Sequence, residues 1–503
     1  MLIYPTPSIP AAYASASEAF GCLVARLGTP ESLGAEHAGV ERMIASLGTE
    51  VLRRVFEAWV NERAAAEPRR DVVVGDDDVA RTHHRSASRS IESRFGTVYF
   101  WRDRVSSAGV SSRAPVDAVL NLPADRFSFG VRERVVEEAI RGSFESAVKA
   151  VGETTGASVA KRQAEEIVRA AAVDFTAFYA EDAVPVASDA QTLLVLTADG
   201  KGIVMRADGL RDATRQAAEK GSHKLERRLS KGEKKNRKRM AEVAAVYDLP
   251  RVPRSEDDVV GELDRTATTT RPRARNKRVW ASIEKPLHTV IAEMFDEAHR
   301  RDPEHQRRWV ALVDGNKSQI REIRSAARRE GVEVTLVLDV IHVIEYLWSA
   351  AWDVFAEGDP AAEKWVRKYL TEILRGRAPI VAAAIRRAAT VRKLEKRAGI
   401  DKAAAYLLKY KAMLRYDLYL RDGLPIATGV IEGACRHLVK DRMDITGARW
   451  GLKGAEAILQ LRSLATSGDL AAYWEFHQGR EFWRNHASGY AASEDAWVWR
   501  AAA

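Results

Sequence analysis

Short apolar runs that alternate with helical patterns between residues 193 and 355 place the strongest limit on the fold. Five runs are typical of buried strands: LLVLTADG (193–200), GIVMRADG (202–209), NKRVWASI (276–283), WVALVDG (309–315) and VEVTLVLD (332–339). Helical patterns cover 285–301, 317–331 and 342–355. The first two runs predict a hairpin that turns at Asp199 and Gly200. Apolar strands that alternate with helices predict a mixed sheet covered on both faces.

The order of these elements is strand, strand, strand, helix, strand, helix, strand, helix, which is the order of a ribonuclease H-like fold. We expect an α+β or α/β multidomain protein around such a core. The predicted regions are a helical N-terminal region and linker (1–93), a region with a helix-turn-helix (94–185), the mixed-sheet core (186–344) with a basic insertion (211–270), a helical insertion (345–425), a return to the core (426–475) and a C-terminal tail (476–503).

Within the N-terminal half, local patterns predict further elements. Residues 1–70 have helical spacing, the polar stretch 71–93 predicts a linker, and 96–106 alternate like a strand. The stretch SFESAVKAVGETTGASVAKRQAEEIVRAA (143–171) resembles a helix-turn-helix whose second helix opens at Ser158. Such a helix would present Lys161 and Arg162 to the DNA major groove. An ordinary pair of short helices explains the same pattern, and the sequence does not separate the two interpretations.

Positive charge is concentrated in one segment. The chain has a net charge of +9, and residues 211–240 hold twelve Lys/Arg against four Asp/Glu, a net charge of +8. A solvated segment is one explanation, and contact with phosphate backbones, favoured by counterion release, is the other. The candidate phosphate-binding residues in this segment are Arg227, Arg228, Lys234, Lys235, Arg237, Lys238 and Arg239.

Three carboxylates follow apolar strand patterns: Asp199, Asp314 and Asp339. Functional groups collect at the carboxyl ends of strands in open sheets, and carboxylates that converge there can share Mg²⁺. Each acid also has a local explanation, since Asp-Gly is a common turn and Asp a common helix cap. Glu432 lies among small residues in TGVIEGACRHLVKDRM and is the candidate fourth acid. A paired, partly buried carboxylate is the alternative for Glu432.

Composition excludes several classes. The 46% hydrophobic content indicates a folded protein, and no run approaches the length of a membrane span. Only Cys22 and Cys435 occur, so neither a disulfide framework nor a thiolate zinc site is expected. We expect a cytoplasmic, bacterial protein that has no membrane partner.

These motifs together resemble the DDE transposases, and are most similar to the ISKra-type insertion-sequence transposases and their Mutator-like relatives. TADGKGIVM, VALVDGNKSQI, LDVIHVIEYLW and TGVIEGACRHLVKDRM…GARWGLKGAEAILQLRSL occur in the family's order over about residues 95–475. The resemblance implies Asp199, Asp314 and Glu432 as catalytic ligands of Mg²⁺ or Mn²⁺. In Mutator-like relatives a Cys/Asp-x-x-His pair follows the second acid after a helix and a strand. Asp339 and His342 match that pair, so the resemblance implies a supporting role for them. A core histidine satisfied by hydrogen bonds is the alternative for His342.

The resemblance also implies the partners. It predicts a transposase that binds the terminal inverted repeats of an element, cleaves a strand and joins it to target DNA, as a dimer or larger assembly on DNA. The relatives' zinc-ribbon cysteines are missing from DRVSSAGVSSRAP (103–115). Further DNA-contact candidates are Arg436, Arg449 and Trp450, although core packing is the favoured explanation for Trp450. A metal-dependent nuclease of the same fold and a non-catalytic DNA-binding regulator remain alternatives.

Overall fold

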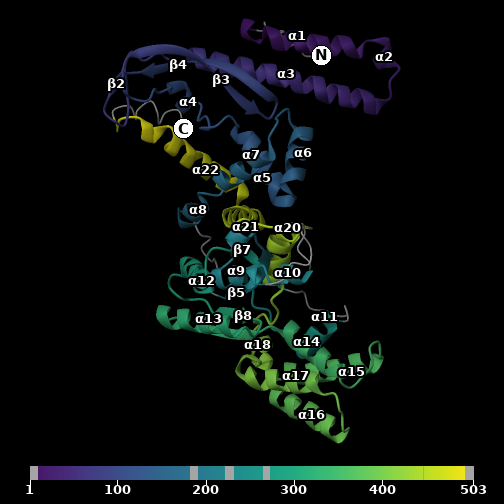
Figure 1. Cartoon of the computed structure of the whole chain (residues 1–503). Helices are drawn as coiled ribbons and strands as arrows, with labels where there is room; N and C mark the ends of the chain where they lie inside the picture. Colours follow the sequence, from purple (N-terminus) through teal and green to yellow (C-terminus); the bar gives the residue numbers. More distant parts are fainter. Residues whose placement is uncertain (1–9, 182–190, 221–230, 264–271, 446, 493–503) are drawn as a thin grey trace. The chain divides into compact units, whose positions relative to one another are not determined.

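The structure is a computed structural model, which describes residues 10–181, 191–220, 231–263, 272–445 and 447–492 (Figure 1). The chain forms two compact units: the first comprises 1–181 and 469–503, and the second comprises 182–468. Among the described residues, none of the helices is both long and apolar enough to cross a membrane. Cys22 is exposed, Cys435 is buried, and both are free thiols.

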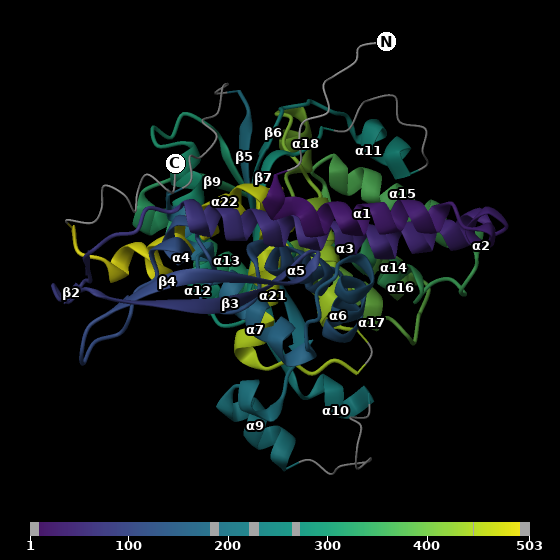
Figure 2. The same cartoon turned by 90° about the horizontal axis from the view of Figure 1, so that it is seen from above.

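The first unit begins with a helical hairpin. Helices α1 (Ala14–Leu27) and α3 (His37–Ala66) lie side by side and are joined by the short helix α2 (Pro30–Leu33) (Figures 1 and 2). The turn η1 (Ala11–Tyr13) precedes α1. Apolar residues at helical spacing predicted this region, and the helical prediction for 1–70 is confirmed over its described part.

A two-stranded ribbon follows where the sequence predicts a linker. Strand β3 (His83–Ser93) pairs antiparallel with β4 (Gly96–Ser106) along its whole length, and the small strands β1 (Val73–Val74) and β2 (Ala80–Arg81) precede them. The linker prediction for 71–93 is therefore wrong, whereas the strand at 96–106 is confirmed. The sequence of β3 is mostly polar, and only three of its eleven residues, Ile91, Glu92 and Ser93, are buried, so apolar periodicity does not mark the strand that its backbone forms with β4.

A cluster of short helices completes the first half of this unit: α4 (Pro115–Val119), α5 (Phe129–Arg141), α6 (Phe144–Thr154), α7 (Lys161–Ala171) and α8 (Phe175–Glu181). Helices α6 and α7 are the predicted pair, and both pack on α5. Helix α7 begins at Lys161, three residues after the predicted start. Gln163 bonds back to the backbone N–H of Ala160, which fixes that start.

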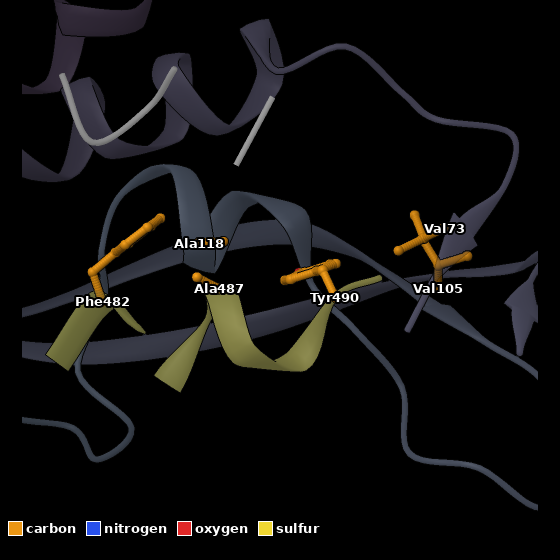
Figure 3. Packing of buried hydrophobic residues seen from close by; sticks show 6 residues of the cluster. All are labelled: Val73, Val105, Ala118, Phe482, Ala487 and Tyr490. Carbon is orange, nitrogen blue, oxygen red and sulfur yellow. The ribbon is translucent and has the colours of Figure 1, made fainter. Parts of the chain in front are cut away.

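The end of the chain returns to this unit. Helix α22 (Leu470–Asn485) and the turn η5 (Ala487–Gly489) cover residues predicted as a tail. Phe482, Ala487 and Tyr490 pack against Val73, Val105 and Ala118 (Figure 3). Buried His477 also contacts Asp174, whose carboxylate pairs with Arg484. The tail prediction for 476–503 is wrong for its described part, because these contacts bury one face of α22.

The second unit is built on a mixed five-stranded sheet with the order β7-β6-β5-β8-β9. Its strands are β5 (Leu193–Val204), β6 (Lys238–Leu249), β7 (Arg275–Ser282), β8 (Trp309–Val313) and β9 (Val334–Leu338). The β5–β6 and β6–β7 pairs are antiparallel, and the β5–β8 and β8–β9 pairs are parallel. The predicted mixed sheet is confirmed.

The predicted hairpin at Asp199-Gly200 is wrong, because β5 continues through both residues. Asp199 pairs with Val243 and Gly200 with Glu242 on β6, so tertiary pairing overrides the local turn signal. Strand β6 lies inside the predicted basic insertion, where the stretch 241–249, apolar except for Glu242 and Asp248, follows a basic run. Charge in the sequence therefore concealed one of the three central strands.

The second unit also contains many helices. They are α9 (Asp212–Glu219), α10 (Lys231–Lys235), α11 (Glu256–Leu263), α12 (Leu287–Arg301), α13 (Lys317–Glu330), α14 (Val340–Ala351), α15 (Pro360–Leu374), α16 (Ala378–Val391), α17 (Ala398–Lys409), α18 (Tyr416–Arg421), α19 (Gly429–Ala434), α20 (Asp441–Met443) and α21 (Leu452–Ser467), with turns η2 (Ala207–Gly209) and η3 (Lys411–Met413). Some of these helices pack on the sheet, whereas α15, α16 and α17 pack on one another and on α14. The predicted helical insertion at 345–425 is helical. Helix α21 protects the edge strand β7, since Glu456, Ser463 and Ser467 accept bonds from alternate N–H groups of residues 279–283.

Candidate functional site

The parallel register of the sheet places the three aspartates in one row. Thr197 on β5 pairs with Leu312 on β8, and Leu312 pairs with Val337 on β9. Asp199, Asp314 and Asp339 each lie two residues beyond this row, on three adjacent strands that run in the same direction. The sequence predicted that these acids share one edge of the sheet, and the register agrees. Asp314 and Asp339 follow the ends of their strands, whereas Asp199 lies within β5.

Asp339 is fully buried and fixed on both sides. Its carboxylate caps helix α14 by accepting the N–H of Ile341 at 2.9 Å, and it also accepts a hydrogen bond from the Thr428 hydroxyl. The N–H of the next residue, Val340, donates to the carbonyl of Ile426 at 2.8 Å. The segment that leads into α19 is therefore joined to the loop that carries Asp339.

Glu432 projects from α19 towards this buried carboxylate. One ligand atom each of Asp339, His342 and Glu432 lies within 4.8 Å of the others. Glu432 is exposed and His342 half-buried, so the group opens to solvent on one side. The His342 ring contacts Glu345 at 2.9 Å. Asp199 and Asp314 are not members of this three-residue group.

Like charges and burial shift the proton equilibria here. Burial raises the pKa of Asp339, although hydrogen bonds from Thr428 and Ile341 oppose the shift. Loss of solvent also raises the pKa of Glu432, and the negative charge of Asp339 raises it further. A divalent cation would remove the repulsion between these two carboxylates.

Cys435 links the helix of Glu432 to Asp199. The thiol is buried in the π-helical turn η4 (Cys435–Lys440) that continues α19, and it donates to Asp199 Oδ2 at 3.2 Å. Burial and the charge of Asp199 raise the pKa of this thiol far above its ordinary value, so the thiol stays protonated. The cysteine count predicts only the lack of disulfides and of a thiolate zinc site, and it does not predict this hydrogen bond. The position of Cys435 three residues after Glu432, on one helix face, was the available signal.

A second missed carboxylate lies across the strand pair. Glu242 on β6 pairs with Gly200, and together with Asp199 it lines a cavity of about 430 Å³ between β5, β6 and the starts of α12 and α13. Burial raises the pKa of Glu242, and the charge of Asp199 contributes in the same direction. The sequence prediction missed Glu242 because it did not recognise β6.

Tyrosines of the helical insertion hold the loops that carry Asp314 and Asp339. The Tyr406 hydroxyl donates to the Asp314 carbonyl at 3.0 Å, and Tyr410 donates to the Gly315 carbonyl at 2.5 Å. Tyr416, fully buried, donates to Leu338 O at 2.7 Å. The Asp314 carboxylate itself caps the loop by accepting the N–H of Asn316 at 2.7 Å. The insertion therefore fixes the backbone on which two of the acids stand.

The donor set fits a divalent cation. Two carboxylates and an imidazole within 4.8 Å of one another supply the oxygen and nitrogen ligands that Mg²⁺ or Mn²⁺ accept. Asp199 and Asp314 lie outside this group but in the same row across the sheet: Asp199 is on β5, and Asp314 directly follows β8. Both residues are half-buried.

The residues predicted to contact DNA differ in how exposed their side chains are. Lys161 and Arg162 are exposed at the start of α7, and Arg162 pairs with Glu166. Arg227, Arg228 and the Lys235 side chain lie outside the described residues. The remaining exposed or half-exposed candidates are Lys234, Arg237, Lys238, Arg436 and Arg449.

Two of the predicted DNA contacts are structural in this molecule. Arg239 donates to the carbonyls of Ile283 and Gly209. Trp450 is 7% exposed, donates to Met443 O and lies beside the Arg442 guanidinium. In this conformation Trp450 packs in the interior and offers no free face to a base.

Neither the protein-family models nor the curated proteins gave a match to this chain.

Proposed function

We propose that this protein is a DNA transposase of the DDE type, with Asp199, Asp314 and Glu432 as its catalytic carboxylates. The observation that carries the proposal is the row of acids on β5, β8 and β9, together with Glu432, which α19 brings to Asp339 and His342. Carboxylates concentrated at one sheet edge are suited to holding a cation between protein and phosphate.

The sheet supports the same proposal. Its order, with the central antiparallel strand β6 beside β5 and two parallel strands on the other side of β5, is the arrangement expected of a ribonuclease H-like core. The helical insertion then separates the strands from the helix that bears Glu432. This agreement is with a fold, and the function rests on the acids.

A bound Mg²⁺ or Mn²⁺ would stabilise negative charge on the phosphate and lower the pKa of a coordinated water. Asp339, His342 and Glu432 would hold such a cation, with Asp199 and Asp314 on the adjacent strands. Asp339 stays fixed through its bonds to Thr428 and Ile341. The neutral thiol of Cys435 donates to Asp199 and so restrains one oxygen of that carboxylate.

The proposed reaction has two steps, hydrolysis and strand transfer. Water attacks the phosphodiester at the element end, which forms a new P–O bond and releases a 3′-hydroxyl. That hydroxyl then attacks a phosphodiester of target DNA and displaces the target strand's own 3′-oxygen, which leaves as a hydroxyl. No covalent protein intermediate is required. The exposed Lys161 and Arg162 on α7 are the proposed contacts to the terminal repeat.

The test is to incubate the purified protein with Mg²⁺ or Mn²⁺ and the DNA that flanks its reading frame, and to map every new 3′ end and junction. Asp199→Ala, Asp314→Ala and Glu432→Ala should each abolish cutting while DNA binding persists. Asp208→Ala is the matched control, since Asp208 is exposed in the second Asp-Gly dipeptide and should be dispensable.

The outcomes separate the alternatives. Discrete ends at an inverted repeat, joined to new DNA, support a transposase. Cleavage without joining indicates a nuclease, and binding without cleavage in either metal indicates a regulator. Cutting retained by one of the three alanine variants removes that residue from the catalytic set.

A further inference from the structure

The cavity of about 430 Å³ beside Asp199 holds polar groups that the row of acids does not explain. It lies between strands β5 and β6 and the starts of helices α12 and α13 (Figure 1). Gln319, in the first turn of α13, lines the cavity and is only 1% exposed. Its side-chain Oε1 has no hydrogen-bond partner among the described residues. A buried amide oxygen without a donor is unfavourable, so this atom indicates a ligand that donates an N–H or O–H group.

Glu242 supplies further acceptor oxygens to the same cavity. It lies on β6, in register with Gly200 on β5. A Cβ placed on Gly200 would meet Met240 Cε at 2.9 Å and Glu242 Oε2 at 3.5 Å, so a side chain at position 200 would occupy the space beside this carboxylate. Glycine weakens the interior of a strand and often marks the close approach of a ligand. Glycine at position 200 therefore keeps the cavity open next to an acceptor group.

The rest of the lining suits a flat, uncharged ring. Met240, which is 44% exposed, gives the cavity an apolar lining together with Pro286 and Leu287. The N-terminus of α12 lies there as well, and no described side chain caps it, so its first N–H groups can donate to a ligand oxygen. The carboxylates of Asp199 and Glu242 disfavour a phosphate group inside. A cavity of this size, with apolar walls and a few polar groups, is typical of sites for small organic ligands.

Guanine matches these groups better than the other DNA bases do. Its Watson–Crick edge carries the O6 acceptor and, side by side, the N1–H and N2–H₂ donors. The adjacent donors can bond to both oxygens of one carboxylate, such as that of Glu242, and N2 has a second hydrogen for an acceptor such as Gln319 Oε1. The O6 atom can accept from the N-terminus of α12. Thymine has a single N–H donor, and adenine and cytosine donate only from one amino group.

We infer that this cavity binds a guanine base of DNA, unstacked from its strand beside the row of acids. Enzymes that act on DNA hold unstacked bases by hydrogen bonds to the Watson–Crick edge and by apolar side chains. The inference rests on the proposed function for the source of the base, and it adds a preference for one nucleotide next to the cleavage site. Gln319 and Glu242 are then specificity-determining residues.

The test compares three fluorescein-labelled single strands of nine nucleotides, which have thymine at every position except the centre. The central base is guanine, hypoxanthine or thymine. Fluorescence anisotropy with the full chain in EDTA gives each Kd, so the result requires neither metal nor cleavage. Because the strands carry equal charge, phosphate contacts contribute equally. Guanine should bind about tenfold more tightly than thymine, and hypoxanthine, which lacks only the N2 amino group, should lose most of that gain.

Two substitutions test the assigned groups. Gln319→Leu and Glu242→Gln should each reduce the guanine preference to less than about twofold, while the Kd of the all-thymine strand stays unchanged. Gln306→Leu and Glu304→Gln are the matched controls and should keep the preference, since both residues are exposed and neither lines the cavity. Thermal melting shows whether each variant is folded. The comparison of guanine with hypoxanthine on the wild-type protein needs no variant.

Equal Kd values for the three strands overturn the inference, and so does a guanine preference that survives both Gln319→Leu and Glu242→Gln. Loss of one bound Mn²⁺ per chain in these variants, with the guanine preference intact, would assign the cavity to a cation instead.

Binding of none of the strands would contradict the proposed function, and calorimetric titration with deoxyguanosine and thymidine then tests the cavity by itself. Tighter binding of deoxyguanosine, lost in Gln319→Leu, would uphold the guanine site and overturn DNA as the source of the base. Equal binding of the two nucleosides would overturn the guanine site.

Discussion

Asp339→Asn separates a metal ligand from a merely structural carboxylate. The asparagine side chain retains an oxygen that can accept from Ile341 N–H, and its amide group can donate to the Thr428 hydroxyl. Asn and Asp are equally good helix N-caps. The substitution therefore preserves the local hydrogen bonds and removes only the negative charge beside Glu432.

The distance between the two carboxylates sets the expected change in the free energy of unfolding. Two unit charges at the 4.8 Å limit of this group repel by about 1 kcal/mol in water and about 3 kcal/mol at an effective dielectric constant of 20. Since Glu432 is exposed, the lower part of this range applies, and we expect metal-free Asp339→Asn to be about 1–2 kcal/mol more stable than the wild-type protein. With Mn²⁺ at 100 times its Kd, the wild-type protein should gain about 2.7 kcal/mol and the variant little.

The assay is urea unfolding of both proteins with EDTA and with Mn²⁺. The stability order should reverse between the two conditions. Asp359→Asn is the control, since Asp359 caps α15 through Ala361 N–H at 2.8 Å and belongs to no acidic group of this site. The reasoning is refuted if Asp339→Asn loses stability in EDTA, or if Mn²⁺ stabilises it as much as the wild-type protein.

Two further predictions concern the same site. Tyr406→Phe removes the bond to the Asp314 carbonyl and should cost about 1 kcal/mol of stability and weaken metal-dependent cleavage. Tyr346→Phe is the control, because it keeps the stacked ring pair with Tyr406. It should change neither the free energy of unfolding nor the cleavage rate, which urea unfolding and a cleavage assay can measure. The raised pKa values of Asp339 and Glu432 favour the folded protein at low pH, and this contribution is lost as pH rises through their folded-state pKa values. Because protons compete with the cation, the Mn²⁺-induced rise in melting temperature should grow from about pH 4 upwards; a rise that is constant with pH would contradict this.

The sequence alone determined much of the second unit. Continuous apolar runs predicted β7, β8 and β9, and helical spacing predicted α12, α13 and α14, because their burial patterns are local properties of the chain. It also placed Asp314 and Asp339 directly after buried strands. In the first unit, the same reasoning predicted α6 and α7 within a few residues.

Tertiary structure decided the rest. The Asp-Gly signal at Asp199 is a local preference, and pairing with β6 overrides it, so that the acid stands within a strand. Strand β6 itself followed a basic run, and β3 has no apolar periodicity, because only three of its eleven residues are buried and two of those three are polar.

The site depends on contacts that no local pattern encodes. Cys435 meets Asp199 across 236 residues of sequence, and Tyr406 meets the Asp314 carbonyl across 92. The sequence supplies the acids and the strands that carry them. Their mutual distances, and the hydrogen bonds that hold them there, exist only once the sheet register and the helical insertion bring distant segments together.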